Sequence, residues 1–186
     1  MAFTTEQFLD DCRLAVRESD AQQAVLELIR SAVSSPSDII QSLGEPTTAG
    51  IQTLYHSDDL TVLNLSWGPG MSLKPHNHEM WAVIGLYGGR EENTFYRRDN
   101  DTLRQFGVKE LNVGDAAPLG ESIIHGVTNP LEKLTCALHV YGGDFFETPR
   151  SEWDPETLEE RPYSVEDTKR VFEESNARLT AMRQSS

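Results

Sequence analysis

The sequence predicts a mainly β protein, a small barrel or sandwich with helices packed against its outside. Residues 51–146 contain short apolar runs of strand length, each bounded by Gly, Pro, Asn or Asp. No helical pattern separates these runs, which favours antiparallel pairing over alternating strands and helices. Apolar residues at helical spacing occur before and after this region.

The composition fits a single folded domain. The chain has 186 residues, 38% of them hydrophobic, and a formal net charge of −14. A chain of this length buries roughly 70% of its unfolded surface, so its core needs neither disulfides nor metals. The negative charge, with no basic cluster larger than a pair, argues against nucleic-acid and anionic-membrane partners. Within this domain we expect a helical extension over 1–48, the barrel over 49–150, and an arm with a helix over 151–186.

Four helices are expected outside the barrel. Thr4 or Thr5 can cap the first, and the second begins at about Asp20. Ser37 can cap a short third helix, and Ser164 can cap the last one. Each helix carries an apolar stripe, with which we expect it to pack on the barrel.

The strands of the barrel are expected at the apolar runs. Residues 147–163, which follow them, are polar and contain three prolines, so they are expected to form an arm. The expected strands are residues 51–55, 60–67, 81–87, 92–96, 105–111, 116–119, 123–127 and 134–141.

The two cysteines, Cys12 and Cys136, indicate a reducing compartment. The N-terminus lacks the basic and apolar segments of a signal peptide, and no apolar run approaches the ~20 residues of a membrane span. We therefore expect a cytoplasmic protein with reduced thiols, either a monomer or a homodimer.

Three histidines indicate a metal site. His76 and His78 are two positions apart, which in a strand places both side chains on one face. His125 lies on another expected strand. An isolated His-x-His pair is more often found on a surface than at a metal, so the case depends on the residues around it.

Those surrounding residues resemble the two motifs of the cupin superfamily. The resemblance implies a jelly-roll barrel in which His76, His78 and His125 hold a metal ion. The glutamate of the first motif is missing, because its position falls at Ala82 or Val83. Gly120 and Ser122 replace the inner Pro and Gly of the second motif. Glu79 is a weak rival ligand, because it follows His78 and would point to the opposite face of a strand. The matching positions are Gly70, His76, His78 and Gly89 in the first motif, and Gly114, His125 and Asn129 in the second.

A site of three neutral imidazoles leaves a divalent ion with both positive charges. Imidazole suits Fe, Zn, Cu and Ni alike, so the ligands alone do not select the metal. The uncompensated charge favours an anionic substrate ligand, such as a thiolate or an enolate. A hydrolytic zinc site would use the same number of protein ligands.

Four further segments resemble the cysteine dioxygenase family, and most closely its bacterial members that act on 3-mercaptopropionate and similar thiols. The resemblance covers roughly residues 51–150. It implies an enzyme that holds one ferrous ion per chain and adds both atoms of O₂ to a small thiol, giving a sulfinic acid. The segments are Trp67-Gly68-Pro69-Gly70, Pro75-His76-Asn77-His78, Trp81-Ala82-Val83-Ile84-Gly85 and His139-Val140-Tyr141-Gly142.

The same resemblance implies roles for the residues around the metal. Tyr141 would donate a hydrogen bond at the open metal face and His139 would orient it. Strand alternation places both on one face. The family's serine is replaced by Ala137, which leaves the imidazole less firmly oriented. The Cys–Tyr thioether of the mammalian-type enzyme is excluded, because its cysteine would fall at Ala82 or Val83.

Substrate contacts are expected from three other residues. Arg150 would grip the carboxylate of a thiol acid, a task that the guanidinium fork fits. Gln52 falls about where the subfamily has a polar pocket residue, and Trp81 would form part of the pocket wall.

Two other functions remain open at this point. One is another three-histidine cupin oxygenase, such as one that cleaves a β-diketone through its enolate. The other is a non-catalytic cupin that binds a metal or a ligand. Arg150→Ala separates the first of these from a thiol-acid enzyme, because a neutral substrate needs no guanidinium.

Overall fold

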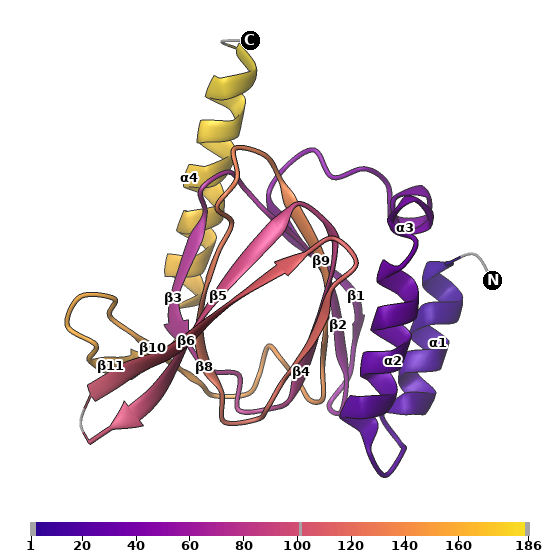
Figure 1. Cartoon of the computed structure of the whole chain (residues 1–186), viewed down its shortest axis with the longest axis horizontal. Helices are drawn as coiled ribbons and strands as arrows, with labels where there is room; N and C mark the ends of the chain where they lie inside the picture. Colours follow the sequence, from indigo (N-terminus) through magenta and orange to yellow (C-terminus); the bar gives the residue numbers. More distant parts are fainter. Residues whose placement is uncertain (1–2, 101, 185–186) are drawn as a thin grey trace.

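The computed structural model describes residues 3–100 and 102–184, and shows two antiparallel sheets that face one another (Figure 1). The first sheet has the order β1-β2-β9-β4-β7 and the second β11-β10-β3-β8-β5-β6. The eight strands from β2 to β9 thus form two four-stranded halves, β2-β9-β4-β7 and β3-β8-β5-β6, which is the strand order of a jelly roll, or double-stranded β-helix. The predicted fold class is confirmed. The first and last residues of the predicted helical regions, 1–2 and 185–186, lie outside the described residues.

The strand bounds agree with most of the expected runs. All eight expected runs are strands, but three more strands, β3, β10 and β11, were missing from the prediction. Polar β3 and the two three-residue strands carry too little apolar pattern to be found. The strands are β1 (Gly50–His56), β2 (Thr61–Trp67), β3 (Ser72–His76), β4 (Ala82–Gly88), β5 (Arg90–Asp99), β6 (Thr102–Asn112), β7 (Ala116–Leu119), β8 (Ile124–Thr128), β9 (Thr135–Tyr141), β10 (Ser151–Trp153) and β11 (Glu160–Pro162).

Alternation along the first sheet divides its side chains between two cores. On β9, Ala137 and Tyr141 lie in the cluster between the sheets, whereas Leu138 and Val140 lie in the cluster beneath the helices. Successive side chains of a strand point to opposite faces, so both faces of this sheet are buried. Every residue of β9 is accordingly buried.

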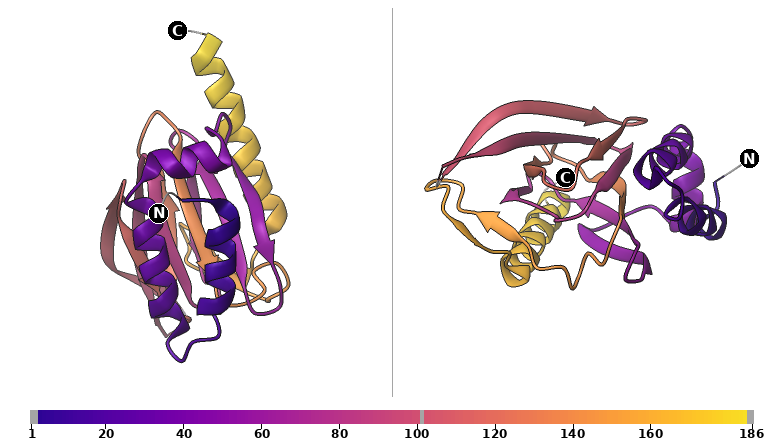
Figure 2. Two further views of the ribbon diagram at one scale, coloured as in Figure 1. Left: turned by 90° about the vertical axis from the view of Figure 1, so that its right-hand side faces the viewer. Right: turned by 90° about the horizontal axis from the view of Figure 1, so that it is seen from below.

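Three N-terminal helices cover the outer face of the first sheet (Figures 1 and 2). They are α1 (Thr5–Ala15), α2 (Ala21–Val33) and α3 (Pro36–Leu43). Thr4 caps α1, as one of the two predicted residues. The predicted cap of α3 is wrong: Ser35 is the N-cap and Pro36 takes the first helical position, so Ser37 lies inside the helix.

Helix α2 lies very close to the sheet at Gly85 of β4. A Cβ added there would meet Ile29 Cγ2 at 2.3 Å. The glycine therefore lets the apolar stripe of α2 lie directly on the backbone of β4, and Ile29 is fully buried.

The C-terminal segment packs along the second sheet. Strand β10 pairs with β3 through Glu152 and His76, so the predicted arm contains ordered strand beside a histidine-bearing strand. Ser164 then caps α4 (Val165–Gln184) by accepting a hydrogen bond from Asp167 N at 3.0 Å, as predicted. Phe172 of α4 stacks on Trp67 of the barrel.

Two smaller features complete the fold. Cys12 and Cys136 are free and buried, and burial raises the pKa of both thiols. Among the described residues, no helix combines the length and the apolarity that crossing a membrane requires.

Candidate metal centre

Three buried histidines meet between the sheets. His76 ends β3 and pairs across the ladder with His125 of β8. His78 lies two residues beyond the end of β3, in the following loop rather than on the strand where the prediction placed it. One ring nitrogen of each residue lies within 4.8 Å of those of the other two. His78 Nε2 and His125 Nε2 are 3.5 Å apart.

Backbone and side-chain acceptors determine which nitrogen of two of these rings faces the others. His76 Nδ1 donates to Lys74 O at 2.8 Å, and His125 Nδ1 donates to Asn93 Oδ1 at 2.8 Å. Each bond leaves Nε2 unprotonated in a neutral ring. His78 Nδ1 is buried without a partner.

The three imidazoles are held in the neutral form. Burial lowers the pKa of His76 to about 4, and the positive charge of Arg150 adds to this effect. Burial also holds the pKa values of His78 and His125 well below their usual range. Neutral imidazole is the form that binds a metal, so protons do not compete for these nitrogens near neutral pH.

This donor set fits one transition-metal ion. Metal–nitrogen bonds of about 2.1 Å in a tetrahedral arrangement separate neighbouring ligand atoms by about 3.4 Å, close to the 3.5 Å between His78 and His125. Within the described part of the chain, these histidines form the group able to hold a metal, and it contains no carboxylate. Glu79 is exposed and bonds to Asn77, so it points away as expected.

Tyr141 and His139 lie beside this cluster on the inner face of β9. Their rings are joined by a hydrogen bond of 3.0 Å between Tyr141 Oη and His139 Nδ1, and the Tyr141 ring lies 5.2 Å from that of His78. Burial raises the pKa of Tyr141 far above its usual value and lowers that of His139 to about 3. Both groups are therefore neutral, and the phenol keeps its proton for donation.

His139 lacks a partner for its other nitrogen. Its Nε2 is buried and makes no hydrogen bond, and Ala137, two residues earlier on the same face, offers only a methyl group. The expected consequence of the missing serine is thus visible as an unsatisfied imidazole nitrogen.

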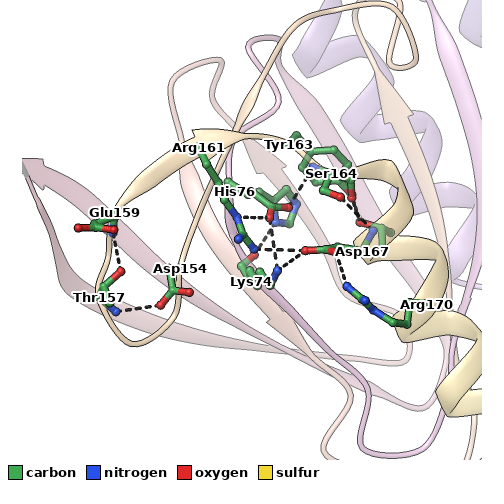
Figure 3. Close-up of polar contacts among 12 residues, drawn as sticks. Lys74, His76, Asp154, Thr157, Glu159, Arg161, Tyr163, Ser164, Asp167 and Arg170 are labelled. Carbon is green, nitrogen blue, oxygen red and sulfur yellow. Dashed lines mark hydrogen bonds and ion pairs between the residues drawn. The ribbon is translucent and has the colours of Figure 1, made fainter.

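Arg150 lies at the outer side of the cluster. Its guanidinium stacks between the rings of Phe145 and Tyr163, at 3.9 and 4.3 Å from their centroids, and Nη1 donates to Phe145 O. Its Nε is buried without a partner. The Tyr163 ring in turn lies 5.9 Å from the ring of His76 (Figure 3).

A mostly apolar cavity of about 430 Å³ opens at this arginine. Phe145, Phe146, Phe172 and Tyr163 are among the side chains that line it. Arg150 lines this cavity and also acts electrostatically on His76 and His78, so an anionic group that enters here meets the guanidinium on the side of the histidine cluster.

Two predicted substrate contacts do not lie in this arrangement. Gln52 pairs with Asn64 on the outer face of the first sheet and accepts a hydrogen bond from its amide at 3.0 Å. Its neighbour Thr53, with the opposite strand parity, faces the cavity instead. Trp81 packs in the outer cluster against Gly142, where an added Cβ would meet its ring.

Residues that the sequence did not single out lie directly behind His125. Asn93 of β5 bonds to its imidazole as given above, and the Phe95 ring lies nearly parallel to it, with the two ring centroids 6.3 Å apart. Glu91, fully buried on the same strand, bonds to Asn93. The inward alternation of residues 91, 93 and 95 after Gly89 is the one signal that could have identified them.

The asparagine of the second motif has a structural role. Asn129 is fully buried, and its Nδ2 donates to the carbonyl oxygens of Trp67, Gly68 and Lys133. It therefore ties the loop after β8 to the segment that leads into β3, which carries His76.

Comparison with solved structures finds proteins of similar fold at low sequence identity. No protein-family model matches the chain. A conserved protein with a double-stranded β-helix domain from Klebsiella pneumoniae is 15% identical, with 64% of this chain and 88% of that one covered and a TM-score of 0.43. An RmlC-like cupin family protein from Methanocaldococcus jannaschii is 9% identical, with 55% and 86% covered and a TM-score of 0.46.

Oxalate decarboxylase from Bacillus subtilis is 21% identical, with 49% of this chain and 22% of that chain covered and a TM-score of 0.40. The match therefore spans less than a quarter of that enzyme. At such identities and TM-scores no activity follows for this chain. The fold is established by its own strand order.

Proposed function

We propose that this chain is a non-haem Fe(II) dioxygenase that oxidises a small mercapto acid to its sulfinic acid. The supporting observation is the combination of three buried neutral imidazoles with a protonated tyrosine and one fixed guanidinium beside them. The resemblance of the histidine motifs to those of thiol dioxygenases supplies the reaction class.

The bound ion would be held by His76, His78 and His125. When present, ferrous iron would supply the redox chemistry that joins both atoms of O₂ to the thiol sulfur. The balance is R–SH + O₂ → R–SO₂H: sulfur loses four electrons, dioxygen gains them, and the thiol proton stays with the product.

Arg150 would bind the substrate's carboxylate. Phe145 and Tyr163 hold its guanidinium from both sides, which limits the side-chain entropy lost when an anion binds. The unsatisfied Nε offers a donor on the buried side. The carboxylate would thus orient the thiol end toward the histidines.

Tyr141 would donate a hydrogen bond toward the ligands at the open side of the ion. For this the phenol must be protonated and directed, and burial together with His139 provides both. When Tyr141 donates toward the ligands, His139 Nδ1–H donates to the phenolic oxygen. The tautomer that this arrangement requires leaves His139 Nε2 without a proton.

Oxygen uptake with a panel of thiols tests the proposal. The chain is loaded with Fe(II) under anaerobic conditions and then mixed with O₂ and mercapto acids, aminothiols or uncharged thiols. We expect one O₂ consumed per sulfinate formed with a mercapto acid, and both sulfinate oxygens labelled from ¹⁸O₂. Metal binding without uptake by any thiol would refute the enzyme proposal and leave a metal-binding protein.

A further inference from the structure

A buried carboxylate lies two hydrogen bonds away from the metal site. Glu91 of β5 is 0% exposed, and both of its oxygens are occupied. Trp67 Nε1 donates to Oε2 at 2.9 Å, and Asn93 Nδ2 donates to Oε1 at 2.8 Å. No described cation forms an ion pair with Glu91, so this charge is held by neutral donors alone.

The chain of hydrogen bonds continues from Asn93 to a ligand. Asn93 is buried, and its Oδ1 lies 2.8 Å from His125 Nδ1. The full sequence is therefore Trp67, Glu91, Asn93, His125. It crosses from β2 in one sheet to β5 and β8 in the other.

The groups at the two ends of this series of hydrogen bonds allow only one donor-to-acceptor direction along it. A carboxylate only accepts hydrogen bonds, so the amide of Asn93 must turn its NH₂ toward Glu91. Its carbonyl oxygen is then left facing His125, and an oxygen acceptor there requires the proton on Nδ1. With Nδ1 protonated, the lone pair of Nε2 faces His78 and His76.

We propose that Glu91 is a positioning residue that, through Asn93, holds His125 in the tautomer whose Nε2 can bind the metal. This inference rests on the metal site of the proposed function but not on thiol oxidation. It assigns a function to a charged group that is otherwise costly to bury, and to the indole N–H of Trp67.

Glu91→Gln reverses the donor-to-acceptor direction of this series of hydrogen bonds. The indole N–H of Trp67 can only donate, so it selects the orientation in which the new amide oxygen faces it. The new NH₂ group then faces Asn93 and donates to its oxygen, which turns the Asn93 NH₂ toward His125. An NH₂ donor requires an unprotonated Nδ1, so the proton moves to Nε2 and blocks the ligand atom.

A double variant with the two groups exchanged is the matched control. In Glu91→Gln with Asn93→Asp, the new carboxylate lies next to His125 and accepts from Nδ1–H. The amide at position 91 donates to it and accepts from Trp67. Each link from Trp67 to His125 again joins a donor to an acceptor, the net charge equals that of the natural protein, and the proton returns to Nδ1.

The experiment reads the tautomer directly. Imidazole ¹⁵N shifts are recorded for His125 in the metal-free protein, at a pH above about 7, the value to which burial raises the pKa of Glu91. Zn²⁺ and Co²⁺ affinities are measured by competition with a chelator. We expect Nδ1–H in the natural chain, Nε2–H with about 10- to 100-fold weaker metal binding in Glu91→Gln, and recovery of both in the double variant.

Three results would overturn the inference. The first is Nε2–H in the natural chain, which needs no variant to fold. The second is an unchanged tautomer and affinity in Glu91→Gln. The third is a loss that the double variant does not restore, which would make Glu91 merely structural. If the tautomers and metal affinities change as expected but the Fe(II)-loaded protein consumes no O₂ with any thiol, the proposed function fails while the positioning role stands.

Discussion

The strongest test of how the C-terminal arm is anchored is Glu152→Gln. Glu152 of β10 is almost fully buried beside β3. Its Oε1 accepts from Arg161 Nε at 2.8 Å and from Lys74 Nζ at 3.4 Å, and its Oε2 accepts from Ser164 N at 3.2 Å. One carboxylate thus joins β3, the arm and the residue that caps α4. Figure 3 shows Lys74 and Arg161 meeting Asp167 of α4 as well.

The expected loss of stability depends on which hydrogen bonds of Glu152 a glutamine amide cannot make. Glutamine keeps the shape and one acceptor oxygen, but its NH₂ must face either a cation or the Ser164 N–H. Losing a hydrogen bond to a charged group costs about 1.5–3 kcal/mol, and breaking a buried pair outright costs about 3–5 kcal/mol. Asp167 still binds Lys74 at 2.7 Å and Arg161 at 3.2 Å, which places the loss at the lower range.

We therefore expect Glu152→Gln to lower the free energy of unfolding by about 2 kcal/mol. For a chain of this size that corresponds to a fall of about 4–8 °C in Tm. Urea and thermal unfolding of the metal-free protein measure both quantities. The arm also carries Arg150 and Tyr163, so faster proteolysis of the arm should accompany the loss.

The chain offers a matched control on the same arm. Glu160 pairs with Arg98, but the two side chains are 38% and 54% exposed. Glu160→Gln should cost less than about 1 kcal/mol, because exposed ion pairs contribute little. Equal losses in the two variants would show that burial of Glu152 does not anchor the arm, and the reasoning would be refuted.

Three further predictions concern the site. Arg150→Gln should raise the KM for a mercapto acid by about 10- to 100-fold and leave that for the mercapto alcohol of the same length unchanged, as measured by oxygen uptake; equal effects would contradict carboxylate binding. Tyr141→Phe should lower kcat by about 10- to 100-fold without weakening Zn²⁺ binding, and an unchanged kcat would exclude the phenol from the reaction. The metal-free protein should lose stability as the pH falls from about 6.5 towards 4, seen as a falling urea midpoint, whereas a flat profile would contradict the neutral cluster. The unfolded chain takes up protons on histidine first, because burial lowers the pKa of His76 to about 4 and that of His139 to about 3, and each unit is worth about 1.4 kcal/mol. Glu91, whose pKa burial raises to about 7, acts in the opposite direction, but it is one group against four buried histidines.

The barrel and the histidine cluster could be predicted because both depend on local spacing. Apolar runs located eight of the eleven described strands, and the positions of His76, His78 and His125 within the two motifs indicated where the ligands would meet. His78 joins the other two histidines as predicted, but it does so from a loop and not from a strand.

The substrate contacts could not be predicted from position in the chain alone. Gln52 and Thr53 are neighbours, and the pairing of Gln52 with Asn64 decides which of them faces outward. Trp81 precedes β4 and follows the outer parity of that strand. A shift of one residue in register moves every side chain to the other face, and register depends on partner strands far along the sequence.

The hydrogen-bonded chain behind His125 was missed for a different reason. Glu91 and Asn93 gain their meaning only when β5 pairs with β8, which places Asn93 beside Val127 and Phe95 beside His125. The alternation within residues 90–99 shows which side chains share a face, but it does not show that this face meets His125. Charged residues in a strand are ordinarily assigned to its solvent face, so the alternation that buries them was overlooked.

The first sheet, buried on both faces, separates two tasks within a single strand. Along β9, one set of side chains faces the interior that holds the three histidines, and the interleaved set supports the helices. Neighbouring residues of this strand are therefore constrained by different packing partners. Substitutions at Leu138 or Val140 act on the packing of the helical layer, whereas Tyr141, the next residue along the strand, lies in the other cluster. Substitutions that repack the N-terminal helices therefore need not change the side chains around the three histidines.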